Sequence, residues 1–507
     1  MDKIIIIDFG SQYNMLISRR IREMNVFCEV VSCEEEIKFD INIKGIILSG
    51  GPNSVYDKFA PIIHESIFKL NVPILGICYG MQILVKTFGG EVVKGDVREY
   101  GKNKINIIKD SSLTKDLNKT SKVWMSHSDH VGLMPKEFDI LATSNFSIAI
   151  IKHQTKAIYG VQFHPEVTHT DEGEQLLKNF VFNVCKTEAN WSIKDFIADK
   201  VEEIKSIVKE ETVILGLSGG VDSTVAAALL SKAINKQLIC IFVDTGLLRK
   251  NEALEVLKNY EIFKDLNIVK IDAEAEFFNA LKGISEPEEK RKIIGRVFFE
   301  VFEKAKLKYQ SAKFLAQGTI YPDVIESISV NGPSQTIKSH HNVGGMPKQE
   351  AFKIIEPLRE LFKDEVRKVG VQLGLDKALV NRHPFPGPGL GIRIIGEVTK
   401  DKVLILQEAD QIFINALRKH NLYDKVSQAF AVLLPVKTVG VMGDVRTYEN
   451  VLTIRSVNSS DFMTAEFSRL PYDFLDEVST EIINKVKGIN RVVYDITSKP
   501  PGTIEWE

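Results

Sequence analysis

A cysteine near residue 80 stands where a strand is expected to end and a helix to begin. Cys78 follows the apolar run 73–77 and lies between Gly76 and Gly80. The N-terminus of a helix favours the thiolate over the thiol, and the glycines permit a sharp turn and the close approach of a substrate. The segment therefore predicts a nucleophile, with a small buried apolar side chain as the alternative.

A histidine and a glutamate two residues apart could serve that thiol. The strand expected at 159–163 is followed by His164 and, after a proline, by Glu166. On an extended chain, side chains two residues apart point the same way. His164 could take the thiol proton, and Glu166 could orient the imidazole and stabilise its charge. Each residue alone would be read as structural, but the combination predicts one catalytic group.

A glycine-rich segment further along predicts an anion site. It follows the strand expected at 213–217 and opens a helix. Consecutive glycines allow φ > 0 and leave successive N–H groups pointing into one hollow, where hydroxyl side chains and the helix dipole add to the attraction. No Gly-Lys-Ser/Thr follows, so this is not a Walker P-loop, and transfer of a γ-phosphoryl group is disfavoured. The residues of the loop are Ser218, Gly219, Gly220, Val221, Asp222, Ser223 and Thr224.

Three further acidic residues have two interpretations each. Asp244 ends the strand expected at 238–243 and could bind a ribose or a metal, or simply cap the next turn. Asp323 and Glu326 lie three apart at the expected start of a helix. They could ligate Mg²⁺ or support nucleotide activation, and helix capping is the alternative.

A polar segment with adjacent histidines follows them. His340 and His341 come two residues after Lys338 and precede two glycines. Neighbouring side chains on an extended chain diverge, and no third ligand follows at a suitable spacing, so we reject a metal site. A glycine-rich loop carrying Lys338 and two imidazoles fits a mobile lid over phosphates better.

Alternating strands and helices must position these groups. In the first part of the chain, short apolar runs that predict buried strands are each followed by an amphipathic segment, which indicates mainly parallel sheets flanked by helices. The expected strands there are 4–7, 46–48 and 73–77, and the expected helices are 13–24, 62–70 and 80–88. A connecting helix at 192–210 leads to a second unit with strands 213–217 and 238–243 and a helix at 225–230.

The densest run of proline and glycine, at 383–391, marks a second boundary. Beyond it the sequence predicts a smaller α+β domain with helices 404–420 and 474–486 and strands 451–457 and 491–496. We therefore divide the chain into domains 1–190, 191–382 and 383–507.

Composition limits the classes of function. The 507 residues carry 65 Lys and Arg against 67 Asp and Glu, a net charge of −2, which argues against nucleic-acid binding by bulk charge. No run of 18 apolar residues and no secretory leader is seen, so neither a membrane span nor export is expected. Five scattered cysteines without a CxxC pair are typical of a cytoplasmic protein.

The first domain resembles the class I glutamine amidotransferases, through GICYGMQ around Cys78 and GVQFHPE around His164 and Glu166. The resemblance implies that Cys78 attacks the side-chain amide of glutamine, releasing ammonia and leaving a glutamyl thioester that water hydrolyses. It also implies an oxyanion hole made by the backbone N–H groups of Gly51 and Tyr79. Gln82 and the stretch 126–129 match family positions that hold the substrate.

The second domain resembles the PP-loop ATP pyrophosphatases, whose motif is SGGVDS. The loop would then hold the pyrophosphate that leaves when ATP is cut between its α- and β-phosphates. A carboxylate such as Asp222 would be repelled by a triphosphate unless a hard cation bridged them, which points to Mg²⁺. Ammonia production joined to ATP cleavage implies adenylation of an acceptor oxygen, followed by displacement of AMP by ammonia.

The chain as a whole is similar to the glutamine-hydrolysing GMP synthetases, through KSHHNVGG, RHPFPGPGLGIR, VGVMGDVRTY and KPPGTIEWE. That family implies XMP, ATP and glutamine as substrates, GMP as the product, and a homodimer formed through the C-terminal domain. By matching position the residues that would bind XMP are Arg296, Lys499, Ile504 and Glu505. Two alternatives stay open: a glutamine-dependent NAD synthetase, and a nucleotide-sensing protein without catalysis.

Overall fold

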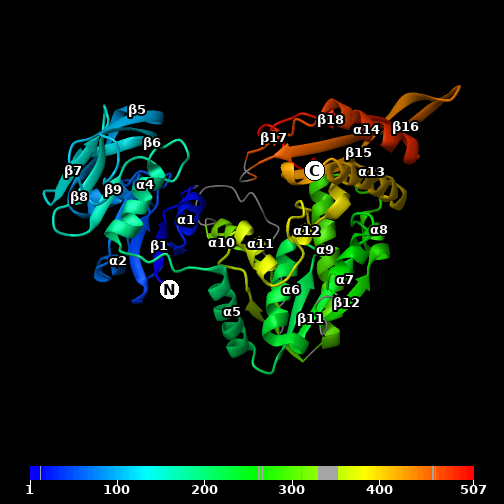
Figure 1. Ribbon diagram of the computed structural model, residues 1–507, viewed down its shortest axis with the longest axis horizontal. Coiled ribbons are helices and arrows are strands. Elements are labelled where there is room, and N and C mark those ends of the chain that lie inside the picture. Colours follow the sequence, from blue (N-terminus) through cyan, green and yellow to red (C-terminus); the bar gives the residue numbers. More distant parts are fainter. Residues whose placement is uncertain are drawn as a thin grey trace. The chain divides into compact units, whose positions relative to one another are not determined.

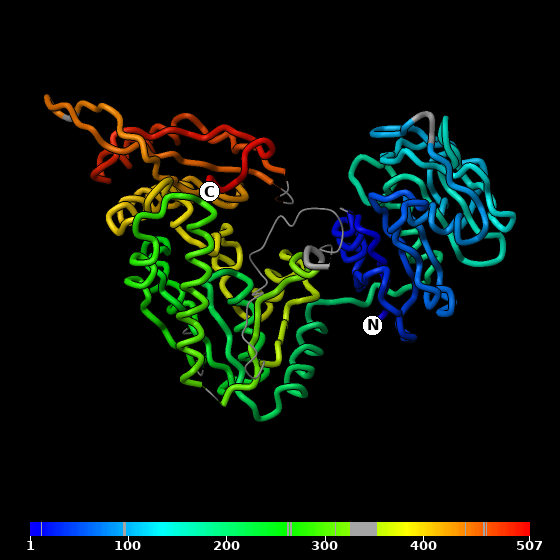
Figure 2. Tube along the Cα trace, turned by 180° about the vertical axis from the view of Figure 1, so that it is seen from behind, coloured from blue at the N-terminus to red at the C-terminus, as the bar shows by residue number. Residues whose placement is uncertain are grey.

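The computed structural model describes the chain except for residues 12, 261–262, 264–265, 310, 329–351, 460–461 and 463. The side chains of 95–97, 325–328 and 442 are likewise not described. The chain divides into two compact units. One contains residues 1–196 and 320–346, and the other contains 197–319 and 347–507 (Figure 1, Figure 2).

A nine-stranded sheet in the order β2-β1-β3-β4-β9-β8-β7-β5-β6 forms the centre of the first unit. Strands β2, β1, β3, β4 and β9 are parallel, and the strands from β9 to β6 are antiparallel. The strands are β1 (Lys3–Asp8), β2 (Phe27–Ser32), β3 (Ile43–Leu48), β4 (Ile74–Ile77), β5 (Glu91–Ile107), β6 (Thr120–Leu133), β7 (Phe138–Thr143), β8 (Ile148–His153) and β9 (Ile158–Val161). The helices are α1 (Asn14–Glu23), α2 (Ser66–Lys69), α3 (Tyr79–Thr87), α4 (Gly173–Lys178) and α10 (Tyr321–Ile328).

The parallel half of this sheet is buried on both faces, as its continuous apolar strands predict. Residues Ile4 to Ile7 of β1 are at most 2% exposed. The helix expected at 62–70 is shorter than predicted and consists of α2, Ser66–Lys69. The ring Nδ1 of His64 accepts a hydrogen bond from the Ser66 backbone N–H, a local alternative to helical bonding.

Two sheets make up the second unit. A five-stranded parallel sheet has the order β12-β11-β10-β13-β14, and in a mainly antiparallel sheet β16 pairs with β15, β17 and β18. The strands are β10 (Thr212–Leu217), β11 (Leu238–Asp244), β12 (Asn267–Asp272), β13 (Ala312–Ala316), β14 (Lys353–Ile355), β15 (Gln428–Met442), β16 (Val445–Asn458), β17 (Glu466–Phe467) and β18 (Ile489–Asp495). The helices are α6 (Val221–Ile234), α7 (Glu252–Tyr260), α8 (Glu274–Leu281), α9 (Pro287–Lys306), α11 (Lys363–Gln372), α12 (Lys377–Val380), α13 (Lys400–Lys419) and α14 (Tyr472–Lys485), and α5 (Ile193–Val208) leads into this unit from the first.

An apolar core that contains residues of both sheets joins them within this unit. It contains Ile241 of β11, Phe277 of α8, Val297 of α9, Phe413 of α13 and Leu452 of β16. The expected fold class is confirmed. Two α/β regions each contain parallel strands flanked by helices, and a small α+β region follows at the C-terminus. No helix in the described part of the chain is both long and apolar enough to cross a bilayer.

Candidate active sites

Cys78 lies at a strained turn between β4 and α3. Its φ is +51° and its ψ is −106°, a conformation that a non-glycine residue adopts only when its surroundings enforce it. The surroundings are tight, since a Cβ added to Gly76 would lie 2.5 Å from the carbonyl oxygen of Gly80. A Cβ added to Gly80 would lie 2.3 Å from the carbonyl oxygen of Leu48. The glycines on both sides of the thiol are therefore required by close packing.

His164 and Glu166 follow β9, the strand that pairs with β4. His164 Nδ1 lies 2.8 Å from Glu166 Oε1, and both side chains are buried. Burial opposes protonation of the imidazole, but the charge of Glu166 and hydrogen bonds with Cys78 and Glu166 outweigh it, so the pKa of His164 is raised well above its ordinary value. The ring of Tyr13 contacts the imidazole edge-on at 4.9 Å between centroids. The structure therefore brings the thiol, imidazole and carboxylate together.

The glycines after β3 face the same point. A Cβ on Gly50 would lie 3.2 Å from Cε1 of His164, and one on Gly51 would lie 3.4 Å from the ring of Tyr79. Among the described residues, neither the Gly51 nor the Tyr79 backbone N–H donates to a backbone carbonyl in a turn, loop or cap. Such N–H groups at a helix start can donate hydrogen bonds to an oxyanion, and each contributes about 3–4 kcal/mol where it does so.

Gln82 lies in a polar network on the other side of the thiol. Its Nε2 donates to the backbone oxygen of Asp129 at 2.7 Å and to Oε1 of Gln162 at 3.4 Å. The Asp129 carbonyl also contacts Nδ1 of His127 at 3.0 Å. The stretch 126–129 thus contacts Gln82 through the backbone of β6.

The glycine-rich loop joins β10 to α6 in the second unit. Gly219 has φ +74°, and Gly220 is the N-cap of α6. The hydroxyl groups of Ser223 and Thr224 donate to the carbonyl of Gly220 at 3.1 and 2.8 Å. Ser218 Oγ accepts from the Gly220 N–H at 3.3 Å, so the loop is closed by its own side chains.

A lysine that lies in none of the sequence motifs contacts this loop. Lys363 Nζ, in the first turn of α11, lies 2.7 and 2.6 Å from the two carboxylate oxygens of Asp222. Both side chains are partly exposed. The carboxylate expected to attract a cation therefore has an ammonium partner in this structure.

The other acidic candidates make local contacts. Asp323 Oδ2 accepts from the Ile320 N–H at 3.0 Å, which is the capping alternative. Asp244 accepts from the Gly246 N–H at 3.2 Å and pairs with Lys270 at 2.9 Å. No cluster of three metal-ligating side chains occurs within the described ranges. The side chain of Glu326 and the proposed lid residues Lys338, His340 and His341 lie outside the described residues.

The C-terminal tail is held by buried arginines. The carboxylate of Glu505 accepts two bonds from Arg393, at 3.0 and 2.8 Å, and one from Gln428 at 2.7 Å. Ile504 is buried, and Lys499 Nζ donates to the carbonyl of Phe462 at 2.7 Å. Glu505 is therefore bound within the chain, by partners that were not predicted from the sequence.

Arg296 is not among those partners. Its side chain is 60% exposed and pairs with Glu300 at 3.1 Å. Arg291, five residues earlier on α9, instead donates to the carbonyl oxygen of Glu507. Among the arginines of α9, the structure places Arg291 at the tail.

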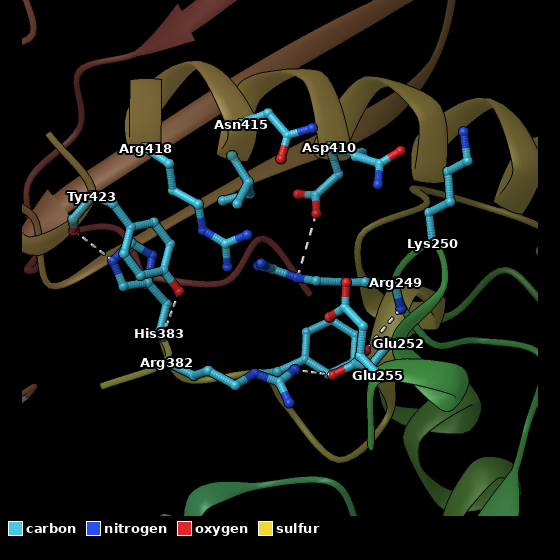
Figure 3. Close-up of a pocket in the computed structure, with 13 residues that line it drawn as sticks. Arg249, Lys250, Glu252, Glu255, Arg382, His383, Asp410, Asn415, Arg418 and Tyr423 are labelled. Carbon is cyan, nitrogen blue, oxygen red and sulfur yellow. Dashed lines mark hydrogen bonds and ion pairs between the residues drawn. The ribbon is translucent and has the colours of Figure 1, made fainter. Parts of the chain in front are cut away.

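A cavity of about 70 Å³ lies in the second unit, among side chains of α7, α13 and the segment after α12 (Figure 3). Arg249 contacts Asp410 at 3.3 Å, and Arg382 pairs with Glu252. Arg382 also donates to the Gly219 carbonyl at 3.1 Å. Two ion pairs, Arg249–Asp410 and Arg382–Glu252, therefore lie in the lining of the cavity, and Arg382 also contacts the glycine-rich loop.

His383, beside this cavity, gives the fold a pH dependence. Its ring stacks on Tyr423 at 3.8 Å, and Nε2 donates to the Tyr423 carbonyl at 2.9 Å. Burial, with the charge of Arg249, lowers the pKa of His383 from 6.5 to about 4. The unfolded chain therefore binds this proton below pH 6.5, whereas the folded chain does so only near pH 4. The contribution of neutral His383 to the free energy of unfolding is therefore complete above pH 6.5 and is lost as the pH falls from 6.5 to about 4.

We expect this histidine to remove about 2 kcal/mol of unfolding free energy between pH 7 and pH 5. His383→Gln keeps a donor but does not titrate in this range. The difference in unfolding free energy between wild type and variant, measured by denaturant titration, should narrow by that amount at pH 5. A constant difference across this range would contradict the assignment.

Comparison with known families covers both sites. The class I glutamine amidotransferase model matches residues 5–184, the NAD synthase model matches 190–291, and the GMP synthase C-terminal domain model matches 415–506. The glutamine-hydrolysing GMP synthase of Mesoplasma florum is 60% identical over 100% of this chain and 99% of its own. Those of Fusobacterium nucleatum (58%, covering 99% of both chains) and Spiroplasma kunkelii (57%, covering 100% of this chain and 99% of its own) are similar along the whole length.

The fold and the two sites define a glutamine-dependent ligase, in which an amidotransferase domain is joined to an ATP-using synthetase domain. These relatives are more than half identical to this chain over nearly the full length of both chains, which is enough to assign the family. The chain belongs to the glutamine-hydrolysing GMP synthase family.

Proposed function

We propose that this protein converts XMP, ATP, glutamine and water into GMP, AMP, pyrophosphate and glutamate. The observation that carries the proposal is the presence, in one chain, of a Cys-His-Glu group at a sheet edge and an SGGVDS loop at a helix start. One group frees ammonia from an amide, and the other binds the phosphates of ATP. Full-length similarity to GMP synthases supports XMP as the acceptor.

In the amidotransferase half, Cys78 is the nucleophile and His164 moves the proton. The thiol proton passes to the imidazole, which Glu166 orients at 2.8 Å and stabilises when charged. His164 then protonates the leaving ammonia, and water hydrolyses the thioester. The N–H groups of Gly51 and Tyr79 stabilise the oxyanion, and Gln82 contributes to glutamine binding.

In the synthetase half, the loop Ser218 to Thr224 holds the pyrophosphate that leaves when XMP is adenylated. The loop offers a single carboxylate. That fits Mg²⁺, because this ion is commonly bound by one or two carboxylates together with the phosphate oxygens of the substrate. Asp222 is the residue that would hold it, with Asp323 and Glu326 as further candidates. The ion would neutralise charge on the phosphates. Ammonia then displaces AMP from the activated XMP.

The tail supplies the acceptor site. Lys499 is proposed to contact the XMP phosphate, and Ile504 and Glu505 to contact its base. Arg393 and Gln428 hold the Glu505 carboxylate in one orientation, which supports a role in recognition. Arg296 is also proposed to contact XMP, which would require its side chain to leave Glu300. Lys338, His340 and His341 are proposed to close over the phosphates.

The test is a reaction with purified protein, Mg²⁺ and all three substrates. GMP and AMP should form in equal amounts, each dependent on XMP, with glutamate released alongside. Failure to form either nucleotide would overturn the proposal.

The match of residues 190–291 to the NAD synthase model favours one alternative, amidation of deamido-NAD. The match of residues 415–506 to the GMP synthase C-terminal domain argues for XMP instead. Parallel assays with XMP and deamido-NAD as acceptors decide between them. A protein that binds nucleotides without turnover would show neither product.

We further propose a division into domains 1–190, 191–382 and 383–507, a cytoplasmic location, and a homodimer formed through the last domain. Exposed apolar residues on the β15–β16 hairpin and on β18 support the dimer. They are Val436, Val439, Val441, Val445, Tyr448 and Val493. Sedimentation of the purified protein as a monomer alone would contradict the dimer.

A further inference from the structure

Gln162 lies directly beside the thiol of the amidotransferase site. Strands β4 and β9 are parallel neighbours, with Ile77 opposite Val161, so the residues that follow, Cys78 and Gln162, stand side by side at the carboxyl edge of the sheet. The Cys78 N–H donates to the Val161 carbonyl at 2.7 Å. The side chain of Gln162 is fully buried. A buried amide of this kind needs partners for its polar atoms.

The amide of Gln162 has those partners in one orientation only. Its Nε2 lies 3.8 Å from Cys78 Sγ, and its Oε1 accepts from Gln82 Nε2 at 3.4 Å. Gln82 Nε2 also donates to the Asp129 carbonyl at 2.7 Å, so both its protons are used. Rotating the Gln162 amide by half a turn would set two NH₂ groups face to face and turn an oxygen toward the sulfur. The network therefore fixes an N–H donor toward the thiol.

We propose that Gln162 is a further catalytic residue of the amidotransferase site, whose amide N–H stabilises the thiolate of Cys78. A buried thiolate loses its hydration and gains from each donor aimed at it, whereas a neutral thiol gains little. Ionisation transfers the thiol proton to His164, so the N–H of Gln162 and the imidazolium stabilise the sulfur from two sides. This role rests on the proposed hydrolysis of glutamine by the first domain.

The groups that face the sulfur come from two segments, the chain that follows β9 and strand β6. The imidazole of His164 follows β9, with Glu166 behind it. The carbonyl of Ser126, on β6, lies 3.9 Å from Sγ and accepts from the thiol. Within these contacts the charged groups are His164 and Glu166, and both are retained in the test.

Two variants of Gln162 test the role. Gln162→Glu keeps the shape and an oxygen toward Gln82 but turns a carboxylate toward the sulfur, and Gln162→Leu removes the donor. We expect the pH midpoint for alkylation of Cys78 by iodoacetamide, followed by peptide mass spectrometry, to rise by about one unit in Gln162→Leu and by more in Gln162→Glu. Glutaminase kcat/KM should fall about 10- to 100-fold. GMP formation from added ammonium should be unchanged.

The matched control is Gln154→Glu, which makes the same change at an exposed glutamine of the same unit and should leave the midpoint unchanged. Because the ammonium-driven reaction belongs to the other compact unit, folding of each variant is checked by its circular dichroism spectrum and thermal midpoint. The isosteric Gln162→Glu keeps the test available if the leucine variant fails to fold. An unchanged midpoint in Gln162→Glu would overturn the proposal, even if glutaminase activity fell. If the wild type released no glutamate, the proposed function would fail instead, while the alkylation midpoint would still report on Gln162.

Discussion

Replacement of Cys78 by alanine is expected to abolish GMP formation from glutamine and to leave GMP formation from ammonium within about twofold of wild type. Without the sulfur no thioester can form, and loss of an enzymic nucleophile lowers kcat by about 10⁴-fold or more. The synthetase loop belongs to the other compact unit and makes no use of the thiol. Parallel assays with glutamine and with ammonium chloride as nitrogen sources measure the two activities.

Cys185→Ala is the matched control for this variant. Cys185 is a second buried cysteine of the same unit, and burial raises the pKa of its thiol, so it is not poised for ionisation. The control should keep both activities. Loss of the ammonium-driven reaction in Cys78→Ala, with the fold intact, would contradict the assignment of Cys78 to ammonia production alone.

The proximity of Cys78 and His164 could be predicted from the sequence, because both follow apolar strands and the ends of parallel strands share one edge of a sheet. The register was not predictable. Only the pairing of Ile77 with Val161 shows that Gln162 is the neighbour of the thiol. The antiparallel half of the first sheet was also missed. Its signal was present in β6, where buried Val123 and Met125 alternate with more exposed residues.

Contacts between distant segments could not be predicted from the sequence for a different reason. Lys363 and Asp222 are 141 residues apart, and no local pattern links them. Arg291 and Arg296 are five positions apart on α9, which places them about 140° apart around the helix. A motif match cannot tell which of them faces the tail. In the structure the guanidinium of Arg291 contacts Glu507 of the tail, and that of Arg296 pairs with Glu300.

Replacement of Asp222 by alanine is expected to abolish GMP formation from both glutamine and ammonium. Asp222 is the carboxylate of the glycine-rich loop, in the first turn of α6, and it is the residue proposed to hold Mg²⁺ against the phosphates of ATP. A loss of at least about 10³-fold is expected, since phosphoryl charge must be neutralised in the adenylation step. ATP–pyrophosphate exchange in the presence of XMP measures that step without any nitrogen donor.

The ion pair with Lys363 makes this prediction separable from a loss of stability. Both side chains are partly exposed, 28% for Asp222 and 41% for Lys363, and such pairs contribute about 0–1 kcal/mol. The thermal midpoint of Asp222→Ala should therefore change little while exchange disappears. Asp364→Ala, which removes an exposed carboxylate one residue from Lys363, is the matched control and should keep full exchange. Adenylation precedes the use of ammonia, so the exchange assay and the overall turnover should fail together in Asp222→Ala. If this variant kept normal exchange and turnover, the carboxylate would be excluded from the nucleotide site. The cation would then have to be held by other residues.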